Sequence, residues 1–350
     1  MKAIFKKHIL DFKRPSGTSR GVLTKKDTYF IILTDGQRQG IGECGLLKGL
    51  SIDDTPDYEK MLLWVCSHIH LGAAKLWEAL TLFPSIQFGV EQAFLSLQAD
   101  NPFELFPSDF TNKTTPIPIN GLIWMGEEAF MHEQIQEKLA QGFNCIKMKI
   151  GAIDFKSEYV LLQSIRKKYS PEKIELRVDA NGAFSTDEAM DKLKLLSALK
   201  IHSIEQPIRQ GQLPEMQQLC ASTPLPIALD EELIGVFGVT EKEKMLQMVQ
   251  PQYIILKPSL VGGFKGSMEW IRIAEKLKIG WWVTSALESN IGLNAIAQWT
   301  FTLKNRLPQG LGTGGLFTNN FDSPLSVENG TLRYDRSKNW QKHLIKDLCI

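Results

Sequence analysis

The sequence predicts an α/β protein built around a (β/α) barrel, with a separate α+β domain in front of it. Two observations lead to this fold class. From about residue 117, short apolar or β-branched runs alternate with amphipathic stretches of helical length, the pattern of parallel strands joined by crossover helices. In addition, Asp179, Glu205 and Asp230 each close one apolar run, at intervals of 26 and 25 residues, which is the length of one βα unit.

Eight barrel strands are expected, near residues 117–121, 144–150, 174–179, 201–205, 226–230, 253–257, 280–285 and 309–313. The stretches between them have helical patterns. The one over 186–200 is opened by Ser185 or Thr186 as N-cap, with acids in its first turn. Eight strands with seven or eight helices in roughly 200 residues favour a barrel over an open sheet. No G-x-G-x-x-G follows the first strand, which disfavours a dinucleotide-binding fold.

Residues 1–115 have a different pattern and predict the α+β domain. Strand-like runs (YFIILTDGQ, QGIGECG) come first, and helical stretches follow around 56–70, 72–82 and 90–98. The segment LFPSDFTNKTTPIP reads as a linker to the barrel domain, which we expect to span 116–319. A strand pattern (GTLRYD) in residues 320–350 predicts that this tail completes the first domain.

The composition favours a small-molecule partner. Lys and Arg number 40 against 39 Asp and Glu, so there is no charge excess to attract nucleic acid or an anionic membrane. The five cysteines form no C-x-x-C pair, which fits a reducing cytoplasm. Charged residues interrupt the N-terminal segment, so it does not read as a signal peptide, and no run reaches the ~20 apolar residues of a membrane span.

The three strand-closing acids, Asp179, Glu205 and Asp230, predict a single divalent metal site. Active sites of (β/α) barrels are built at the carboxyl ends of strands, where these side chains would converge. Converging carboxylates repel one another strongly unless a cation neutralises them. Ligands that are all oxygen suit a hard cation, so Mg²⁺ is the first expectation and Mn²⁺ the second.

Lysines extend this series on both sides. Lys147 and Lys149 are two residues apart on one strand, so both face the same side. Two neighbouring ammonium groups lower each other's pKa, which would make a lysine a usable general base near neutral pH. Lys257 lies on the sixth expected strand, with three strands between it and the strand of Lys149, and would act from the opposite face of a bound substrate. Lysines beside carboxylates predict a proton-transfer site.

Further polar residues at the strand ends are candidates for substrate binding. Arg177 faces inward and binds substrate or pairs with Glu175, and Asn181 lies just beyond Asp179 in the loop. Near the seventh strand the candidates are Thr284, Ser285 and Glu288. Amides of the Gly262-Gly263 turn either bind an anion or form a plain turn.

Five motifs together resemble those of the enolase superfamily, in the muconate-lactonizing-enzyme subgroup. They are K-x-K at 147–149, R-V-D-A-N at 177–181, E-Q-P at 205–207, D-E at 230–231 and K-P at 257–258. Within the subgroup, A-L-E-S-N-I-G at 286–292 and G-L-G-T-G-G-L-F at 310–317 resemble the o-succinylbenzoate synthases, dehydratases of menaquinone synthesis. The D-x-D of dipeptide epimerases is absent, because Gly312, Thr313 and Gly314 stand there.

The resemblance implies a modified (β/α)8-type barrel, (β/α)7β, with residues 1–115 as a capping domain, and a Mg²⁺-dependent carbon–oxygen lyase acting on a small carboxylate. Lys149 would remove the proton α to the carboxylate, with Lys147 beside it, and Lys257 would stabilise the enediolate. Gly310 and Thr313 would contact substrate. Racemisation of N-acylamino acids or epimerisation of dipeptides would use the same lysines and stays open as the alternative.

The resemblance also implies that the capping domain closes the mouth of the barrel. The candidate lid is the loop that follows Pro15, with Ser16, Gly17, Thr18, Ser19 and Arg20. A plain surface turn is the other interpretation of this segment.

Overall fold

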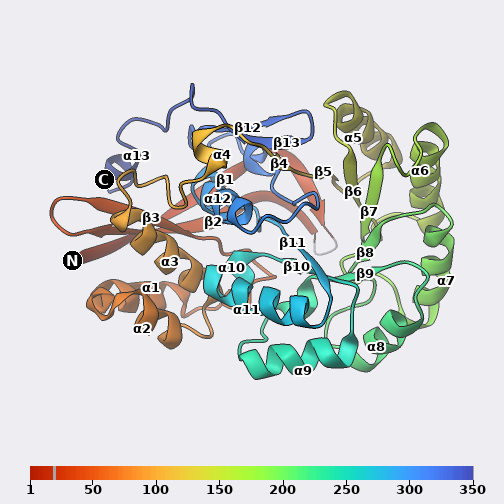
Figure 1. Cartoon of the computed structure of the whole chain (residues 1–350), viewed down its shortest axis with the longest axis horizontal. Helices are drawn as coiled ribbons and strands as arrows, with labels where there is room; N and C mark the ends of the chain where they lie inside the picture. The colour runs from red at the N-terminus through yellow and green to blue at the C-terminus, as the bar shows by residue number, and fades with distance from the viewer. Residues whose placement is uncertain (19–20, 350) are drawn as a thin grey trace.

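The structure, a computed structural model, describes residues 1–18 and 21–349, and it has two parts: a head with an antiparallel sheet and a barrel of parallel strands (Figure 1). The barrel strands are β5 (Gly121–Ile123), β6 (Cys145–Lys149), β7 (Glu175–Asp179), β8 (Ser203–Glu205), β9 (Ile227–Leu229), β10 (Tyr253–Leu256) and β11 (Gly280–Val283). They form one sheet in sequence order from β5 to β11, and all pairs are parallel. The predicted α/β barrel fold is confirmed.

The sheet closes through a very short eighth position. Gln309 pairs in parallel with Ile119, and Gly310 pairs in parallel with Thr284. The amide of Gln309 donates to Pro118 O at 2.8 Å, and the amide of Gly310 donates to Val283 O at 2.8 Å. The eighth strand predicted over 309–313 is therefore reduced to two residues. The first strand lies at Gly121–Ile123 rather than over 117–121, because Ile117–Pro118 (β4) pairs with the tail instead.

Helices follow most barrel strands and cover the outside of the sheet: α5 (Glu128–Ala140), α6 (Phe155–Lys168), α7 (Thr186–Ser197), α8 (Leu213–Ser222), α9 (Val239–Val249), α11 (Gly263–Lys276) and α12 (Asn290–Thr302). Short helical turns precede or follow them: α10 (Pro258–Val261), η2 (Glu231–Leu233) and η3 (Gly314–Leu316). At the start of α7, Ser185 and Glu188 form a capping box, so Ser185 is the N-cap. The apolar faces of these helices and the strands share one core.

The head consists of strands β1 (Lys2–Thr18), β2 (Gly21–Thr34) and β3 (Gln39–Cys44), with helices α1 (Tyr58–Ser67), η1 (Ile69–Leu71), α2 (Gly72–Ala79) and α3 (Pro84–Gln98). The sequence did not reveal β1, since polar and apolar residues are mixed along it. Helix α3 packs closely on β3: a Cβ atom on Gly42 would lie 1.9 Å from Gly89 O. Glycine at these two positions therefore sets the spacing of helix and sheet.

The linker and the tail join the two parts. The linker contains α4 (Asp109–Asn112), and the tail contains β12 (Leu325–Glu328), β13 (Thr331–Tyr334) and α13 (Leu344–Leu348). The GTLRYD strand, β13, pairs with β12 and with β4 beside the barrel rather than with the head sheet. Helix α13 does reach the head, where Leu344 and Ile345 share a core with Phe30. The domain boundaries at 115 and 320 stay a prediction.

Two glutamates of the head bind the N-termini of two barrel helices. Glu43 on β3 accepts hydrogen bonds from the amides of Ser289 at 2.9 Å and Gly292 at 2.9 Å, at the start of α12. Glu91 on α3 accepts from the amides of Phe264 at 2.6 Å and Lys265 at 3.1 Å, at the start of α11. The free amides of a helix N-terminus favour a negative charge. Directly after the Gly262-Gly263 turn, where an anion was considered, the chain itself thus supplies a carboxylate, that of Glu91.

Among the described residues, no helix is both long and apolar enough to cross a membrane.

Replacing Glu91 with alanine leaves the amides of Phe264 and Lys265 without a partner at the head–barrel contact. We expect the free energy of unfolding to fall by about 1–3 kcal/mol, measured by urea denaturation. The matched control is Glu133→Ala at an exposed position of α5, which should change the free energy of unfolding by less than about 0.5 kcal/mol. Equal stability of the two variants would contradict the docking role of Glu91.

Candidate active site

The six predicted acids and lysines lie at the carboxyl ends of five successive strands. Lys147 and Lys149 lie on β6, Asp179 on β7, Glu205 on β8, Asp230 directly after β9, and Lys257 directly after β10. Strand register brings them level: Lys149 is paired with Asp179, and Asp179 with Glu205. Five of them are buried, and Lys257 exposes 12% of its side chain. Strand length and register alone thus bring these charges together at the barrel mouth.

Each carboxylate of this ring is paired with a lysine. Lys147 Nζ lies 3.0 Å from Asp179 Oδ2 and also contacts Glu205 Oε2. Lys149 Nζ lies 3.4 Å from Asp179 Oδ2, and Lys257 Nζ contacts Asp230 Oδ2. Buried charges are expensive unless they are paired, so these contacts keep the ring compatible with folding.

The pKa values follow from these pairs. Burial lowers the pKa of Lys147, but the charges of Asp179 and Glu205 outweigh burial and raise it above its ordinary value. For Lys257 burial is likewise outweighed, chiefly by Asp230, and the pKa is raised. The prediction that a neighbouring ammonium group lowers the pKa of Lys147 is therefore wrong, because two carboxylates face this lysine and their charges dominate the shift.

The carboxylates respond unequally. Burial disfavours ionised Asp179, but Lys147 and Lys149 outweigh it and hold its pKa below the ordinary range. For Glu205, burial and then the charge of Asp179 raise the pKa well above its usual value. Glu205 is thus the carboxylate with the greatest need of a further positive charge.

The chemistry of this ring fits a divalent cation. As the side chains lie, the described residues contain no group of three acid, histidine or cysteine side chains gathered closely enough to hold a metal ion, because each acid is turned toward a lysine. However, Glu205 Oε1 is buried and has no hydrogen-bond partner among the described residues. Three buried carboxylates with one free oxygen form an oxygen donor set suited to Mg²⁺.

Loop residues next to the ring hold it in place. Asn181 accepts a hydrogen bond from Lys149 Nζ at 2.8 Å and donates one to Glu231 Oε1 at 2.9 Å. Buried Gln206 accepts from the Asp230 amide at 3.3 Å and donates to Glu232 Oε2 at 3.0 Å. Asn181 and Gln206 both have positive φ, 44° and 40°, the type of backbone strain that clusters at functional sites.

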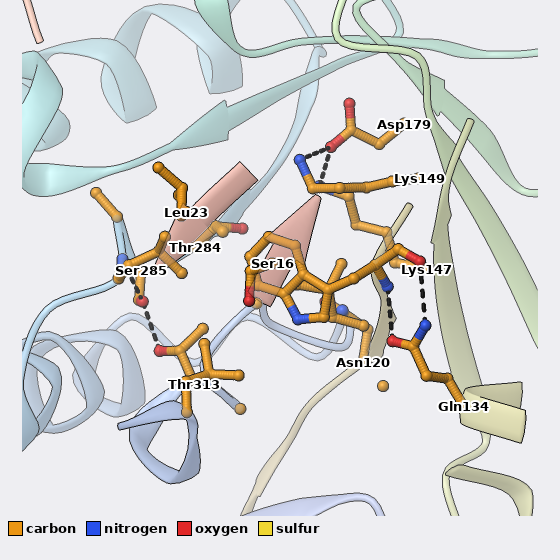
Figure 2. A pocket seen from close by; sticks show the side chains of 18 of the residues that line it. Ser16, Leu23, Asn120, Gln134, Lys147, Lys149, Asp179, Thr284, Ser285 and Thr313 are labelled. Atoms are coloured by element: carbon orange, nitrogen blue, oxygen red, sulfur yellow. Dashed lines mark hydrogen bonds and ion pairs between the residues drawn. The ribbon is translucent and has the colours of Figure 1, made fainter. Parts of the chain in front are cut away.

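The ring lies beneath a cavity of about 370 Å³ at the barrel mouth. Of the predicted residues, Lys147, Lys149, Asp179, Asn181, Lys257, Thr284, Ser285, Gly310, Thr313 and Ser16 line it. Figure 2 shows Lys147, Lys149 and Asp179 on one side and Thr284, Ser285 and Thr313 on the other, with Ser16 of the head between them. Ser285 and Thr313 share a hydrogen bond of 2.6 Å.

The rest of the lining escaped sequence reasoning. Head residues Leu23, Leu47, Lys48 and Leu50 form part of the wall, and Trp124, Phe130 and Gln134 form another part. Single apolar residues in a loop carry no sequence signal. For Gln206 a signal existed, because it stands inside the E-Q-P motif, but that motif was interpreted only through Glu205.

The described part of the predicted lid, residues 16–18, lies in strand β1 rather than in a free loop. Residues up to Thr18 belong to β1, and Gly17 forms an antiparallel bridge with Met125 beyond β5. A Cβ atom on Gly17 would lie 2.5 Å from Met125 O, so glycine is required for this approach. Ser19 and Arg20 lie outside the described residues. That the segment acts as a lid stays a prediction.

Two predicted substrate-binding residues do not line the cavity. Arg177 is buried in the middle of β7, where it pairs with Glu175 at 2.7 Å, donates to Pro308 O at 2.9 Å and stacks over Trp282 at 4.3 Å. Glu288 is fully buried at the contact with the head and accepts from Ser259 Oγ at 2.5 Å. For Arg177 the structure thus shows the second of its two predicted interpretations, the pair with Glu175, and neither Arg177 nor Glu288 lines the cavity.

Known proteins place this site in a family. A sequence profile described as enolase C-terminal domain-like matches residues 130–337. The chain belongs to the enolase superfamily. This confirms the resemblance given by the strand-end motifs. The crystal structure of a muconate lactonizing enzyme from Pseudomonas fluorescens has the same fold as this chain, with a TM-score of 0.83. The two sequences are 20% identical, over 99% of this chain and 98% of the other.

Other known proteins have a higher sequence identity to this chain. An o-succinylbenzoate synthase of Desulfotalea psychrophila is 48% identical over 95% of this chain and 98% of its own length. The crystal structure of MenC from Desulfotalea psychrophila LSv54 has a TM-score of 0.84 and 44% identity, over 95% of this chain and 99% of its own. An L-Ala-D/L-Glu epimerase of Bacillus subtilis is 27% identical over 59% of this chain and 54% of its own length.

The corrected place of Arg177 leads to a prediction. Arg177→Met breaks a buried ion pair and a hydrogen bond, so we expect the free energy of unfolding to fall by about 2–4 kcal/mol while KM stays unchanged. Lys194→Met, which breaks the exposed pair of Lys194 with Asp191, should cost less than about 0.5 kcal/mol. A large rise of KM in Arg177→Met with unchanged stability would return Arg177 to the substrate site.

Proposed function

We propose that this protein is an o-succinylbenzoate synthase: a Mg²⁺-dependent carbon–oxygen lyase that forms o-succinylbenzoate by β-elimination of water in menaquinone biosynthesis. The observation that carries the proposal is the 48% identity to a synthase over nearly the whole of both chains. The cavity supports it independently, because Lys147, Lys149 and Asp179 line it together with apolar side chains. Such walls suit a hydrocarbon ring that carries carboxylates.

The groups of this chain can carry out each proton movement. Neutral Lys149 takes the proton α to the substrate carboxylate on its Nζ, which lies beside Asn181 and Asp179. The electron pair of that C–H bond then forms the new C=C bond as the C–O bond to the hydroxyl breaks. Lys149 returns its proton to the leaving hydroxyl, which departs as water. Aromatisation of the ring favours this direction.

The remaining charged groups stabilise the developing anion. Lys257 approaches from the strand opposite Lys149 and faces the cavity as an ammonium ion paired with Asp230. Lys147 keeps Asp179 ionised, consistent with the low pKa of that carboxyl. Asp179, Glu205 and Asp230 would hold Mg²⁺, with Mn²⁺ as a substitute. When bound, the ion makes the α-proton of a carboxylate acidic enough for an amine to remove.

Racemisation of N-acylamino acids or epimerisation of dipeptides is the alternative function. It requires only that Lys257 return a proton to the opposite face of the same enediolate. Both reactions would use the same lysines, so these residues do not discriminate between the two functions. The limited share of the chain that the epimerase matches, 59%, gives it less support than the synthase. We propose a cytoplasmic location, supported by five cysteines that are all free thiols.

A substrate panel tests the proposed function. The purified protein is assayed with Mg²⁺ on three compounds: the hydroxylated cyclohexadiene precursor of o-succinylbenzoate, an N-succinyl amino acid and an Ala-Glu dipeptide. We expect turnover of the first with kcat/KM at least about 100-fold above that of the others, measured by absorbance for aromatisation and by chirality for the others. Turnover of either other compound without the first would overturn the synthase proposal.

Lys149→Ala tests the base. We expect a loss of kcat of about 10³-fold, together with loss of solvent deuterium exchange at the α-carbon, since Lys149 is the group that takes this proton in the proposed reaction. Exposed Lys156→Ala on α6 is the control and should retain both activities. Deuterium exchange that persists in Lys149→Ala would assign the base to another residue.

A further inference from the structure

The head and the barrel meet at a buried junction of charged side chains. It is formed by Lys26 on β2, Glu43 on β3, Glu288 in the loop after β11, and Ser259 in α10. Glu43, Glu288 and Ser259 are fully buried, and Lys26 is 4% exposed. The junction lies outside the carboxylate ring, and none of these four residues lines the cavity.

Two atoms of opposite charge at this junction have no hydrogen-bond partner among the described residues: Lys26 Nζ and Glu288 Oε2. Glu43, in contrast, accepts four hydrogen bonds, from Thr28 and Gly292 and twice from Ser289. Burial lowers the pKa of Lys26, against the charges of Glu43 and Glu288. Burial raises the pKa of Glu288, and Lys26 is the main group acting against it. Lys26 and Glu288 therefore act on each other as opposite buried charges, without a hydrogen bond between them.

Glu288 in turn holds the segment that carries Lys257. Its Oε1 accepts the hydrogen bond from Ser259 Oγ at 2.5 Å, and Ser259 is two residues beyond Lys257 in the first turn of α10. The head backbone also lies close to Ser259, since a Cβ atom on Gly45 would lie 2.4 Å from Ser259 Oγ. The three residues before Glu288, Ser285 to Leu287, also line the cavity.

We propose that Lys26 is a positioning residue for Lys257, acting across the head–barrel junction through Glu288 and Ser259. This rests on the proposed function of Lys257 at the active site. With Lys26 in place, Glu288 remains an ionised acceptor for Ser259 and fixes the start of α10. Without Lys26, Glu288 is a buried carboxylate with Glu43 as its charged neighbour. It then shifts toward water, so Ser259 loses its acceptor.

Steady-state kinetics of three variants of the enzyme test this chain of interactions. In Lys26→Met we expect kcat to fall about tenfold while KM changes less than about threefold, since the substrate cavity itself is untouched. In Lys26→Met/Glu288→Gln, a neutral amide oxygen accepts from Ser259 without needing a cation, so kcat should return to within about threefold of wild type. Ser259→Ala, a small change that keeps the fold, should lose kcat as Lys26→Met does.

The control is Lys25→Met, one residue away, whose side chain is 68% exposed and which should keep wild-type kcat. Wild-type kcat in Lys26→Met or in Ser259→Ala would overturn the proposal, and so would failure of Glu288→Gln to restore Lys26→Met, because a packing role of Lys26 is not repaired by changing its partner. Absence of synthase turnover in the wild type would contradict the proposed function instead, so the two failures are distinguishable.

Discussion

The buried ion pairing between carboxylates and lysines at the strand ends is the constraint on which the rest of the structure depends. Three lysines and three carboxylates lie in a ring that is almost closed to solvent. Removing such charges from water costs several kcal/mol per ion unless the geometry is good. The parallel register supplies that geometry, because it places Lys149, Asp179 and Glu205 level with one another. The raised pKa of Glu205 marks the point where the pairing is incomplete.

The head domain completes the site in two ways. It supplies wall residues such as Leu23 and Leu47, and its strand β1 bridges to the barrel at Gly17. It is also held by charge, since Glu43 and Glu91 bind the amides that open α12 and α11. The elements that enclose a substrate are therefore fastened to helices of the barrel whose strands carry Lys257 and Ser285.

The sequence predicted the barrel and the ring because both depend on local pattern. Apolar runs end at Asp179, Glu205 and Asp230 at regular spacing, and the carboxyl ends of parallel strands meet at one edge. It did not predict β1, whose mixed polar and apolar residues hide a strand with one exposed side. It did predict the eighth strand, but over 309–313, whereas the pairing is limited to Gln309 and Gly310.

Two predicted substrate-binding residues lie away from the cavity for a common reason. The spacing of residues in the sequence does not show how far below the barrel mouth a side chain lies. Arg177 shares a face with Asp179 but lies two residues deeper, where Glu175 and Trp282 enclose it. Glu288 follows the strand that carries the cavity residues Thr284 and Ser285, yet it turns toward the head, and its counter-charge, Lys26, comes from a strand 262 positions away in the chain. Contacts of this range need the folded structure.

Calorimetric titration of Mg²⁺ into the protein tests the central claim, that the carboxylate ring is a cation site held closed by lysines. The predicted result is one Mg²⁺ bound per chain, with Kd weakened at least about tenfold in Glu205→Gln, because the free oxygen of Glu205 is lost to the ion. No Mg²⁺ binding to the wild type, or the same Kd in both proteins, would contradict the account.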